Sequence, residues 1–286
     1  MVLEVLDLGA TVHRLEVTDR NGRRRNVVVD HPDAQAYFEG SDYRGATVGR
    51  VANRIAAGGF EVDGRHVEPT PNEGTTTLHG GPDGFDRRIW EVVEHTSDLL
   101  RLRLVSPDGD QGFPGELTST LTYTTSADSV DVEMESTTTA PTVANLTSHV
   151  YWNLDGARTI DDHVLVVEAD EYLPVDDAGI STGAIAPVAG TPYDLRPPDR
   201  IGEREIDLCF VLRGSAALRT DALDLELSTD SPGLQVYTGE LLARAPRSGV
   251  ALEPQLFPDA PHHPDFPSVV LRPGETARTT VRWRFS

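Results

Sequence analysis

The sequence predicts an all-β fold, a large single-domain antiparallel β-sandwich over residues 1–286. Apolar and polar residues alternate with a period of two along many short segments, and turn sequences such as "VDGR", "PDGD" and "RPGE" separate them. No stretch of ten or more residues shows the periodicity of an amphipathic helix. Many short strands joined by turns are typical of antiparallel sandwiches and barrels.

The alternation is clearest in five segments along the chain. Leucine alternates with arginine in "LRLRLVS", and hydroxyl residues alternate with apolar or aromatic ones in "LTSTLTYTT". The other three are "VDVEME", "ALDLELS" and "VRWRFS". The five predicted strands are residues 100–106, 117–125, 130–135, 222–228 and 281–286. No low-complexity linker and no repeat of fixed period divides the chain, which favours one domain.

The charge is strongly negative. The chain has 46 Asp and Glu against 25 Lys and Arg, a formal charge of −21, and contains no lysine. Such a chain lacks the basic patches that nucleic acids and anionic membranes require. At about 1 M salt the Debye length falls to roughly 3 Å, so the self-repulsion is screened and a salt-rich source is expected. An acidic protein that binds cations or basic partners is the alternative.

The single cysteine, Cys209, excludes an internal disulfide, and its apolar context "DLCFVL" indicates a buried, inert thiol. No apolar run is long enough to cross a membrane, and the N-terminus lacks signal-peptide features, so a cytoplasmic location is expected. Phosphate-binding loops and the motifs of zinc and serine hydrolases are also missing from the sequence.

Candidate site residues begin with Asn53 and Arg54 in "VGRVANRI". Adjacent residues of a regular strand face opposite sides, so a shared site requires a local bend, which the glycines just downstream allow. His79 follows in "TTLHGGPDGFDRRIW", where neighbouring glycines let the backbone approach a ligand closely. A histidine in this setting is more often an ordinary turn residue than a catalyst.

The segment 144–156, "ANLTSHVYWNLDG", reads as one strand with a polar face. That face carries Asn145, Thr147, His149, Tyr151 and Asn153. All five can form hydrogen bonds with a sugar, although a solvated outer face is equally consistent. Asp207, within the apolar "EIDLCFVL", suggests an outward or edge position, and Gln235 shares the polar face of a half-buried strand with Tyr237.

The segment 249–268, "GVALEPQLFPDAPHHPDFPS", places Glu253 directly after an apolar run and before several prolines. Proline fixes φ and donates no backbone hydrogen bond. We expect a strand that ends at Glu253, pairing that stops at Pro254, and a stiff wall that holds the carboxylate in one pose. A rigid surface loop without function is the alternative.

These motifs, in this order, resemble the aldose 1-epimerase (galactose mutarotase) family. The matching segments are "GRVANRI", "TLHGGPDGFDRRIW", "GDQGFPGEL", "NLTSHVYWNL", "YLPVDDAGISTG", "YDLR", "IDLCFVL", "PGLQVYTG" and "SGVALEPQLFPDAPHHPDFPS". The resemblance implies a β-sandwich-like fold and interconversion of the α and β anomers of free aldohexoses such as galactose and glucose. It also implies no cofactor, no metal and a small-molecule sugar as partner.

The resemblance assigns catalytic roles to three residues. Glu253 is the general base for the anomeric hydroxyl, His149 is the acid for the ring oxygen, and His79 also contacts the reacting end. The residues expected to hold sugar hydroxyls are Asn53, Arg54, Asp207 and Gln235. We expect Glu253 to be ionised near neutrality, and ionised Glu253 and Asp207 to favour the cationic form of His149.

Alternatives remain open at this point. They are an epimerase of a phosphorylated or different aldose, a carbohydrate-binding protein without chemistry, and a glycoside hydrolase that uses two carboxylates. The segment 243–247, "ARAPR", is short for the family, which leaves the preferred sugar open. The oligomeric state, monomer or homodimer, is also open.

Overall fold

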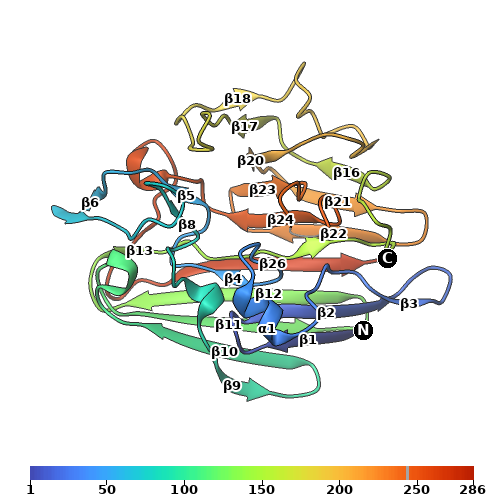
Figure 1. Ribbon diagram of the computed structural model, residues 1–286, viewed down its shortest axis with the longest axis horizontal. Helices are drawn as coiled ribbons and strands as arrows, with labels where there is room; N and C mark the ends of the chain where they lie inside the picture. The colour runs from blue at the N-terminus through green and yellow to red at the C-terminus, as the bar shows by residue number, and fades with distance from the viewer. Residues whose placement is uncertain (243–244) are drawn as a thin grey trace.

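Two large antiparallel sheets form the body of the protein (Figure 1). The structure, a computed structural model, describes residues 1–242 and 245–286. The nine-stranded sheet has the order β19 (Asp199–Arg200), β16 (Val164–Val167), β21 (Ser215–Arg219), β22 (Asp224–Thr229), β26 (Ala277–Phe285), β12 (Ser129–Thr138), β11 (Leu117–Thr125), β10 (Leu99–Ser106) and β9 (Glu91–His95). The six-stranded sheet has the order β15 (Tyr151–Trp152), β24 (Val250–Gln255), β23 (Gly233–Tyr237), β20 (Asp207–Val211), β17 (Glu171–Leu173) and β18 (Ala186–Pro187).

Smaller sheets and turns complete the fold. The three-stranded sheet consists of β1 (Val2–Leu6), β2 (Thr11–Thr18) and β3 (Arg24–Asn26). The two-stranded pairs are β13 (Thr142–Val143) with β25 (Val270–Leu271), β14 (Thr147–Ser148) with β4 (Thr47–Val48), β5 (Arg54–Ile55) with β8 (Thr77–Leu78), and β6 (Phe60–Val62) with β7 (Arg65–Val67). The described residues contain one α-helix, α1 (Ala34–Glu39), and 3-10 turns at Phe85–Arg87, Asp110–Gly112 and Ala260–His262. No helix in the described part of the chain is long and apolar enough to cross a membrane.

The all-β prediction is confirmed, and the five predicted strands are neighbours in one sheet. They are β10, β11, β12, β22 and β26, and they stand in the nine-stranded sheet as β22-β26-β12-β11-β10. Their alternation matches the burial, since every second residue along β11 from Leu117 to Tyr123 is buried. One face of this sheet therefore packs inward while the other carries its polar residues to solvent.

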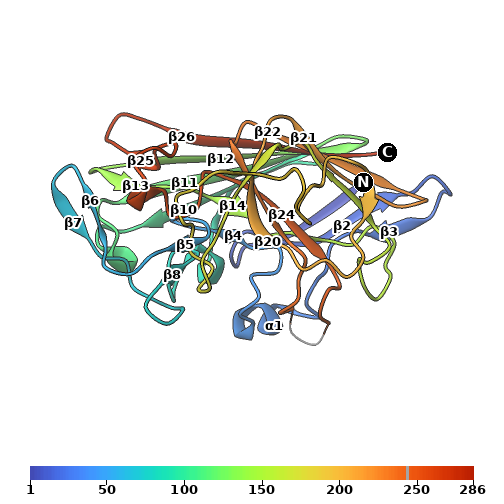
Figure 2. The same ribbon diagram turned by 90° about the horizontal axis from the view of Figure 1, so that it is seen from above.

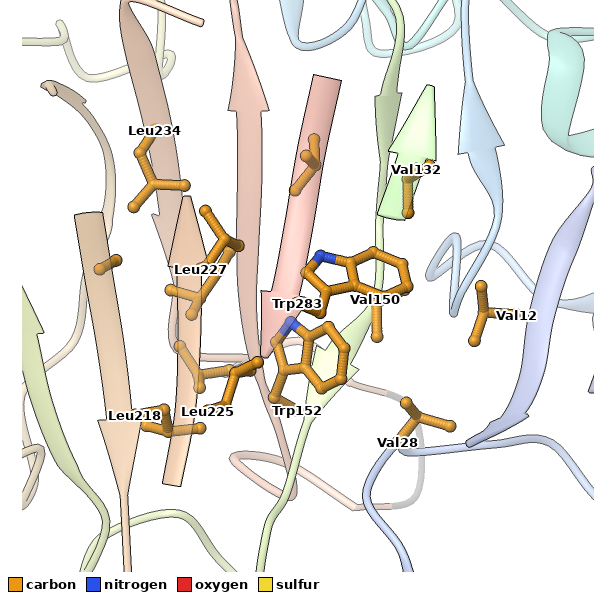
Figure 3. Close-up of a cluster of buried hydrophobic side chains, with 14 of the residues drawn as sticks. Val12, Val28, Val132, Val150, Trp152, Leu218, Leu225, Leu227, Leu234 and Trp283 are labelled. Carbon is orange, nitrogen blue, oxygen red and sulfur yellow. The ribbon is translucent and has the colours of Figure 1, made fainter. Parts of the chain in front are cut away.

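The main core lies where the six-stranded sheet packs against the nine-stranded sheet. The indole rings of Trp152 on β15 and Trp283 on β26 meet edge to face, with centroids 5.0 Å apart (Figure 3). The six-stranded sheet contributes one set of alternating residues to this core: Trp152, Val250, Leu252, Leu234, Val236, Leu208 and Phe210. Each such side chain contributes about 1.5–3 kcal/mol through its burial. The alternate residues of the same strands must point to the opposite face, and that face carries the polar candidates.

The segment 144–156 is not the single strand that its alternation suggests. It forms two separate pairs, β14 with β4 and β15 with β24, and His149 lies between them. All five residues of its polar face are buried, so the solvated-face alternative is wrong. The two halves therefore pair with different strands, and His149 and Val150 lie between the two pairs.

Candidate active site

Glu253, Gln235 and Asp207 share one face of the six-stranded sheet. Gln235 on β23 is paired with Glu253 on β24, and opposite residues of an antiparallel pair project to the same side. The Gln235 Nε2 atom donates to Asp207 Oδ1 at 2.6 Å. The side chains of Glu253 and Gln235 are buried, whereas that of Asp207 is 49% exposed. Asp207 is thus outward-facing as expected, but it lies on an interior strand beside the other candidates.

Glu253 does not end its strand, contrary to the prediction. The pairing of β24 with β23 continues through Pro254, opposite Leu234, to Gln255. On its other side β24 pairs with β15 only at Val250 and Ala251. The proline is tolerated because no ladder partner is needed on that side.

His149 comes within reach of Glu253 from the break between β14 and β15. Its Nε2 atom lies 3.5 Å from Glu253 Oε1, and both side chains are almost fully buried. Backbone hydrogen bonds hold the break, since His149 N donates to Ala46 O and Gly45 N donates to His149 O. Two residues on the predicted polar face, Asn145 and Asn153, bind backbone groups and so hold the fold.

His79 approaches from a tight turn, with φ of 51°. The backbone N–H of Asn53 donates to His79 Nδ1 at 3.2 Å. In the neutral ring Nδ1 must then be the acceptor, so the proton sits on Nε2. A Cβ at Gly80 would lie 1.9 Å from Gly49 O, which explains why glycine follows the histidine here. The turn therefore presents His79 as a neutral N–H donor beside His149, whose ring centroid is 5.2 Å away.

Asn53 and Arg54 reach the same site through a local bend, as expected. The bend is at Asn53 itself, with φ of 64°, and does not use the downstream glycines. The Asn53 Oδ1 atom accepts from the Arg54 backbone N–H at 2.8 Å, which supports the left-handed turn. Arg54 Nη1 then lies 3.8 Å from Asp207 Oδ2. The structure thus brings all seven predicted site residues to one side of the six-stranded sheet.

The surrounding elements lie together on one side of the nine-stranded sheet. Figure 2 shows β4, β5, β8, β20, β24 and α1 on that side. The proline-rich segment after β24 supports β5, because Asp259 N donates to Arg54 O and Ala56 N donates to Asp259 Oδ1 at 3.0 Å. His262 Nδ1 pairs with Asp259 Oδ1 at 2.6 Å. This segment therefore holds the strand that carries Arg54.

Comparison with known proteins gives a consistent result. The aldose 1-epimerase family profile matches residues 1–284. Galactose mutarotase of Homo sapiens is 39% identical over 311 residues, covering 99% of this chain and 91% of that protein. Aldose 1-epimerase of Escherichia coli (strain K12) is 34% identical over 318 residues, covering 100% and 92%.

The chain belongs to the aldose 1-epimerase family.

The enzyme is accordingly an isomerase with the mutarotase activity of that family. A solved aldose epimerase homologue from C. elegans has a TM-score of 0.95 and 31% identity, covering 99% of this chain and 95% of that one. A solved galactose 1-epimerase from Lactobacillus acidophilus has a TM-score of 0.89 and 28% identity, covering 99% and 90%. The family resemblance and the mutarotase-like sandwich predicted from the sequence are therefore confirmed.

Two residues that the sequence did not single out contact the candidate site residues. The Tyr43 ring lies 4.6 Å from that of His79 and 5.9 Å from that of His149, measured between centroids. The Glu73 carboxylate binds Arg54 through two hydrogen bonds, of 2.6 and 3.0 Å. Both residues lie in loops, where no strand periodicity marks a position. For Glu73, the one available signal was its short distance in sequence from His79.

Burial dominates the electrostatics of the enzyme's central pair. Burial raises the pKa of Glu253 well above its usual range, Asp207 raises it further, and Arg54 opposes the shift. Burial lowers the pKa of His149 to about 4. The carboxylate that raises this pKa is Asp42, but burial outweighs it and favours the neutral ring. Burial likewise opposes the ionised form expected for Glu253, because desolvation favours the neutral carboxyl group.

Three of these groups are close enough to be considered as metal ligands. One ligand atom from each of His79, His149 and Glu253 lies within 4.8 Å of the other two. Burial, together with His149 and Arg54, lowers the pKa of His79 well below its usual range, so the ring is neutral. The Asn53 amide places its proton on Nε2, which leaves that atom a donor without a lone pair for a metal. This arrangement suits a sugar oxygen better than a metal ion.

Proposed function

We propose that this enzyme interconverts the α and β anomers of free aldohexoses such as galactose and glucose by general acid–base ring opening and reclosure. The observation that supports this most strongly is the buried pair of His149 Nε2 and Glu253 Oε1, 3.5 Å apart. The anomeric oxygen and the ring oxygen of a hemiacetal are bonded to one carbon. An acid and a base this close can each reach one of those oxygens at about 2.6–3.2 Å.

In the proposed reaction, Glu253 takes the proton from the anomeric hydroxyl and His149 delivers a proton to the ring oxygen. The bond between C1 and the ring oxygen breaks, the C1–C2 bond rotates, and the reverse transfers close the ring on the other face. Burial favours the proton of the pair on the carboxyl group and disfavours it on the imidazole ring. Hydroxyl groups that donate to Glu253 favour its ionised form and so return the proton to His149.

His79 serves in this proposal as a neutral hydrogen-bond donor. Its Nε2–H, set by the Asn53 amide, suits an oxygen that gains negative charge during ring opening. The Glu253 Oε2 atom is buried and has no hydrogen-bond partner among the described protein groups. A buried acceptor without a partner is costly, and a substrate hydroxyl would satisfy it.

Asn53, Arg54, Asp207 and Gln235 bind the remaining hydroxyls in this proposal. Asp207 and Arg54 are charged, and hydrogen bonds to charged groups orient a sugar more firmly than neutral ones. Arg54 already has two carboxylate neighbours, Glu73 and Asp207, so a phosphate would meet a neutralised cation. This supports a free sugar over a phosphorylated one. A sugar-binding protein or a hydrolase would leave the two buried histidines without a role.

Polarimetry on freshly dissolved α-D-glucose and α-D-galactose tests the proposal, with glucose 6-phosphate as the competing substrate. Faster decay of rotation on the free sugars, with no new product, supports it. Preference for the phosphate, release of a sugar from a glycoside, or a decay rate equal to the uncatalysed one would contradict it.

Four further features belong to the proposal. One domain over residues 1–286 is supported by a core cluster that runs from Ala10 to Phe285. A salt-rich source is supported by the charge of −21 without lysine. A cytoplasmic location rests on the sequence features alone, with Cys209 present as a buried free thiol. A sugar is the one partner proposed, and the choice between monomer and homodimer stays open.

A further inference from the structure

Glu73 holds the side chain of Arg54 in a two-point grip. Arg54 Nε donates to Glu73 Oε2 at 2.6 Å, and Nη2 donates to Glu73 Oε1 at 3.0 Å. The remaining nitrogen, Nη1, faces Asp207 Oδ2 at 3.8 Å. Two nitrogens of the guanidinium therefore face Glu73, and the third faces Asp207.

The turn that carries Glu73 is itself braced. Asn72 Nδ2 donates to Leu78 O at 3.0 Å, and Leu78 N donates to Asn72 Oδ1 at 2.7 Å. Glu73 N also donates to Thr76 O. Because Leu78 on β8 is paired with Arg54 on β5, these bonds fix the turn of Glu73 to the strand beside that of Arg54.

The backbone at Gly179 also restricts the position of the Arg54 guanidinium. A Cβ at Gly179 would lie 3.2 Å from both Arg54 Cζ and Nη1, so the backbone of residue 179 covers the group closely. The Glu73 side chain is 42% exposed and that of Arg54 is 18% exposed. Glu73 thus stands at the rim of the site, with Arg54 behind it.

The two hydrogen bonds from Arg54 to Glu73 affect whether Asp207 stays available to a sugar. A planar guanidinium matches a carboxylate best through two parallel hydrogen bonds. Without Glu73, the nearest carboxylate for that geometry is Asp207, whose Oδ2 is already 3.8 Å from Nη1. Such a pair would take up the oxygen that Gln235 leaves free, since Gln235 donates to Oδ1.

We propose that Glu73 is a positioning residue that holds Arg54 away from a closed ion pair with Asp207 and so keeps both groups available to sugar hydroxyls. The inference rests on the proposed function, in which Arg54 and Asp207 hold the substrate. Glu73 acts through substrate binding and takes no part in the proton transfers of His149 and Glu253.

The test is the split between KM and kcat for anomer exchange, measured by magnetisation transfer between the anomeric protons of glucose. Glu73→Gln keeps the shape of the side chain and removes its charge. We expect KM to rise roughly tenfold, as for a lost charge-assisted contact, while kcat changes less than about threefold. Glu73→Asp keeps the charge and should recover a large part of the affinity.

Two further variants distinguish positioning from a general structural effect. Glu91→Gln removes a carboxylate that accepts two hydrogen bonds from Arg103, both at Oε2, at 3.1 and 2.6 Å, on the outer face of the nine-stranded sheet, and should leave KM unchanged. In an Arg54→Lys background, Glu73→Gln should add less than about twofold to KM, because lysine cannot be held at two points.

If the wild-type enzyme is active and the KM of Glu73→Gln lies within about twofold of the wild-type KM, this inference alone is overturned. An equal further rise of KM in the Arg54→Lys background would also overturn it. An inactive wild-type enzyme would overturn the proposed function instead, so the two failures are distinguishable.

Discussion

The Nε2 atom of His149 lies 3.5 Å from Oε1 of Glu253, although the two residues are more than a hundred positions apart in the chain. Both are buried, and burial shifts their pKa values in opposite directions, each toward the neutral form. Burial therefore favours the proton of the pair on Glu253, and a hydroxyl that donates to this carboxylate opposes that preference. In the proposed function, the pair supplies the acid and the base that anomer exchange requires.

The buried histidine predicts loss of stability in acid. The pKa of His149 is about 4 in the folded protein and near 6.5 in the unfolded chain, so the unfolded chain binds the proton more tightly. This residue therefore contributes a loss of stability of at most about 3 kcal/mol as pH falls from about 6.5 toward 4, while the raised pKa of Glu253 acts in the opposite direction. His149→Gln should flatten this dependence in urea unfolding at several pH values. His95→Gln, on the exposed strand β9, is the control and should keep the wild-type slope; an unchanged slope in His149→Gln would contradict the account.

The turn after His79 predicts an unusually costly glycine substitution. Gly80 has a φ of 90°, and a Cβ added there would lie only 1.9 Å from Gly49 O. Gly64 has a similar φ of 78° but no atom within 4 Å, so Gly64→Ala isolates the backbone cost. We expect about 1–2 kcal/mol of destabilisation for Gly64→Ala and about 1–3 kcal/mol more for Gly80→Ala. Equal losses in chemical unfolding would show that the packing at Gly80 is loose.

The charge predicts dependence on salt. A formal charge of −21 repels itself strongly at low ionic strength, and about 1 M salt screens this repulsion. The melting temperature should rise steeply between about 0.1 and 2 M KCl, and rise less in sucrose, which does not screen charge. A melting temperature that is the same in low and high KCl would remove the support for a salt-rich source.

The sequence predicts the strands of the nine-stranded sheet well, because the alternation of apolar and polar residues marks them. Along β11, Leu117, Leu121 and Tyr123 are buried together with Ser119, and Thr118, Thr120 and Thr122 between them are half-buried, so the alternation locates the strand. The same signal misled at 144–156, where both faces are buried and polarity no longer reports exposure. The prediction that strand pairing stops at Pro254 is also wrong, because a proline ends a ladder only where a partner strand needs its N–H.

The site is predictable in its residue types but not in its geometry. The seven candidates come from motifs and from the family resemblance, and the structure brings them together. The bend at Asn53, the tautomer of His79 and the grip of Glu73 on Arg54 depend on contacts between loops. No periodicity or composition reports such contacts. The direction of the pKa shifts likewise follows from burial, which the sequence did not reveal for Glu253.

The central claim is that Glu253 carries the proton of the anomeric hydroxyl, and anomer exchange by Glu253→Gln tests it most directly. The substitution keeps the shape of the side chain and removes the base. We expect the enzyme-catalysed rate on α-D-glucose to fall about 10²–10⁴-fold, with a melting temperature no lower than that of the wild type. Cys209→Ala, a buried change beside Gln235 on the same sheet face, should retain the activity. A Glu253→Gln enzyme that exchanges anomers within about twofold of the wild-type rate would contradict the account.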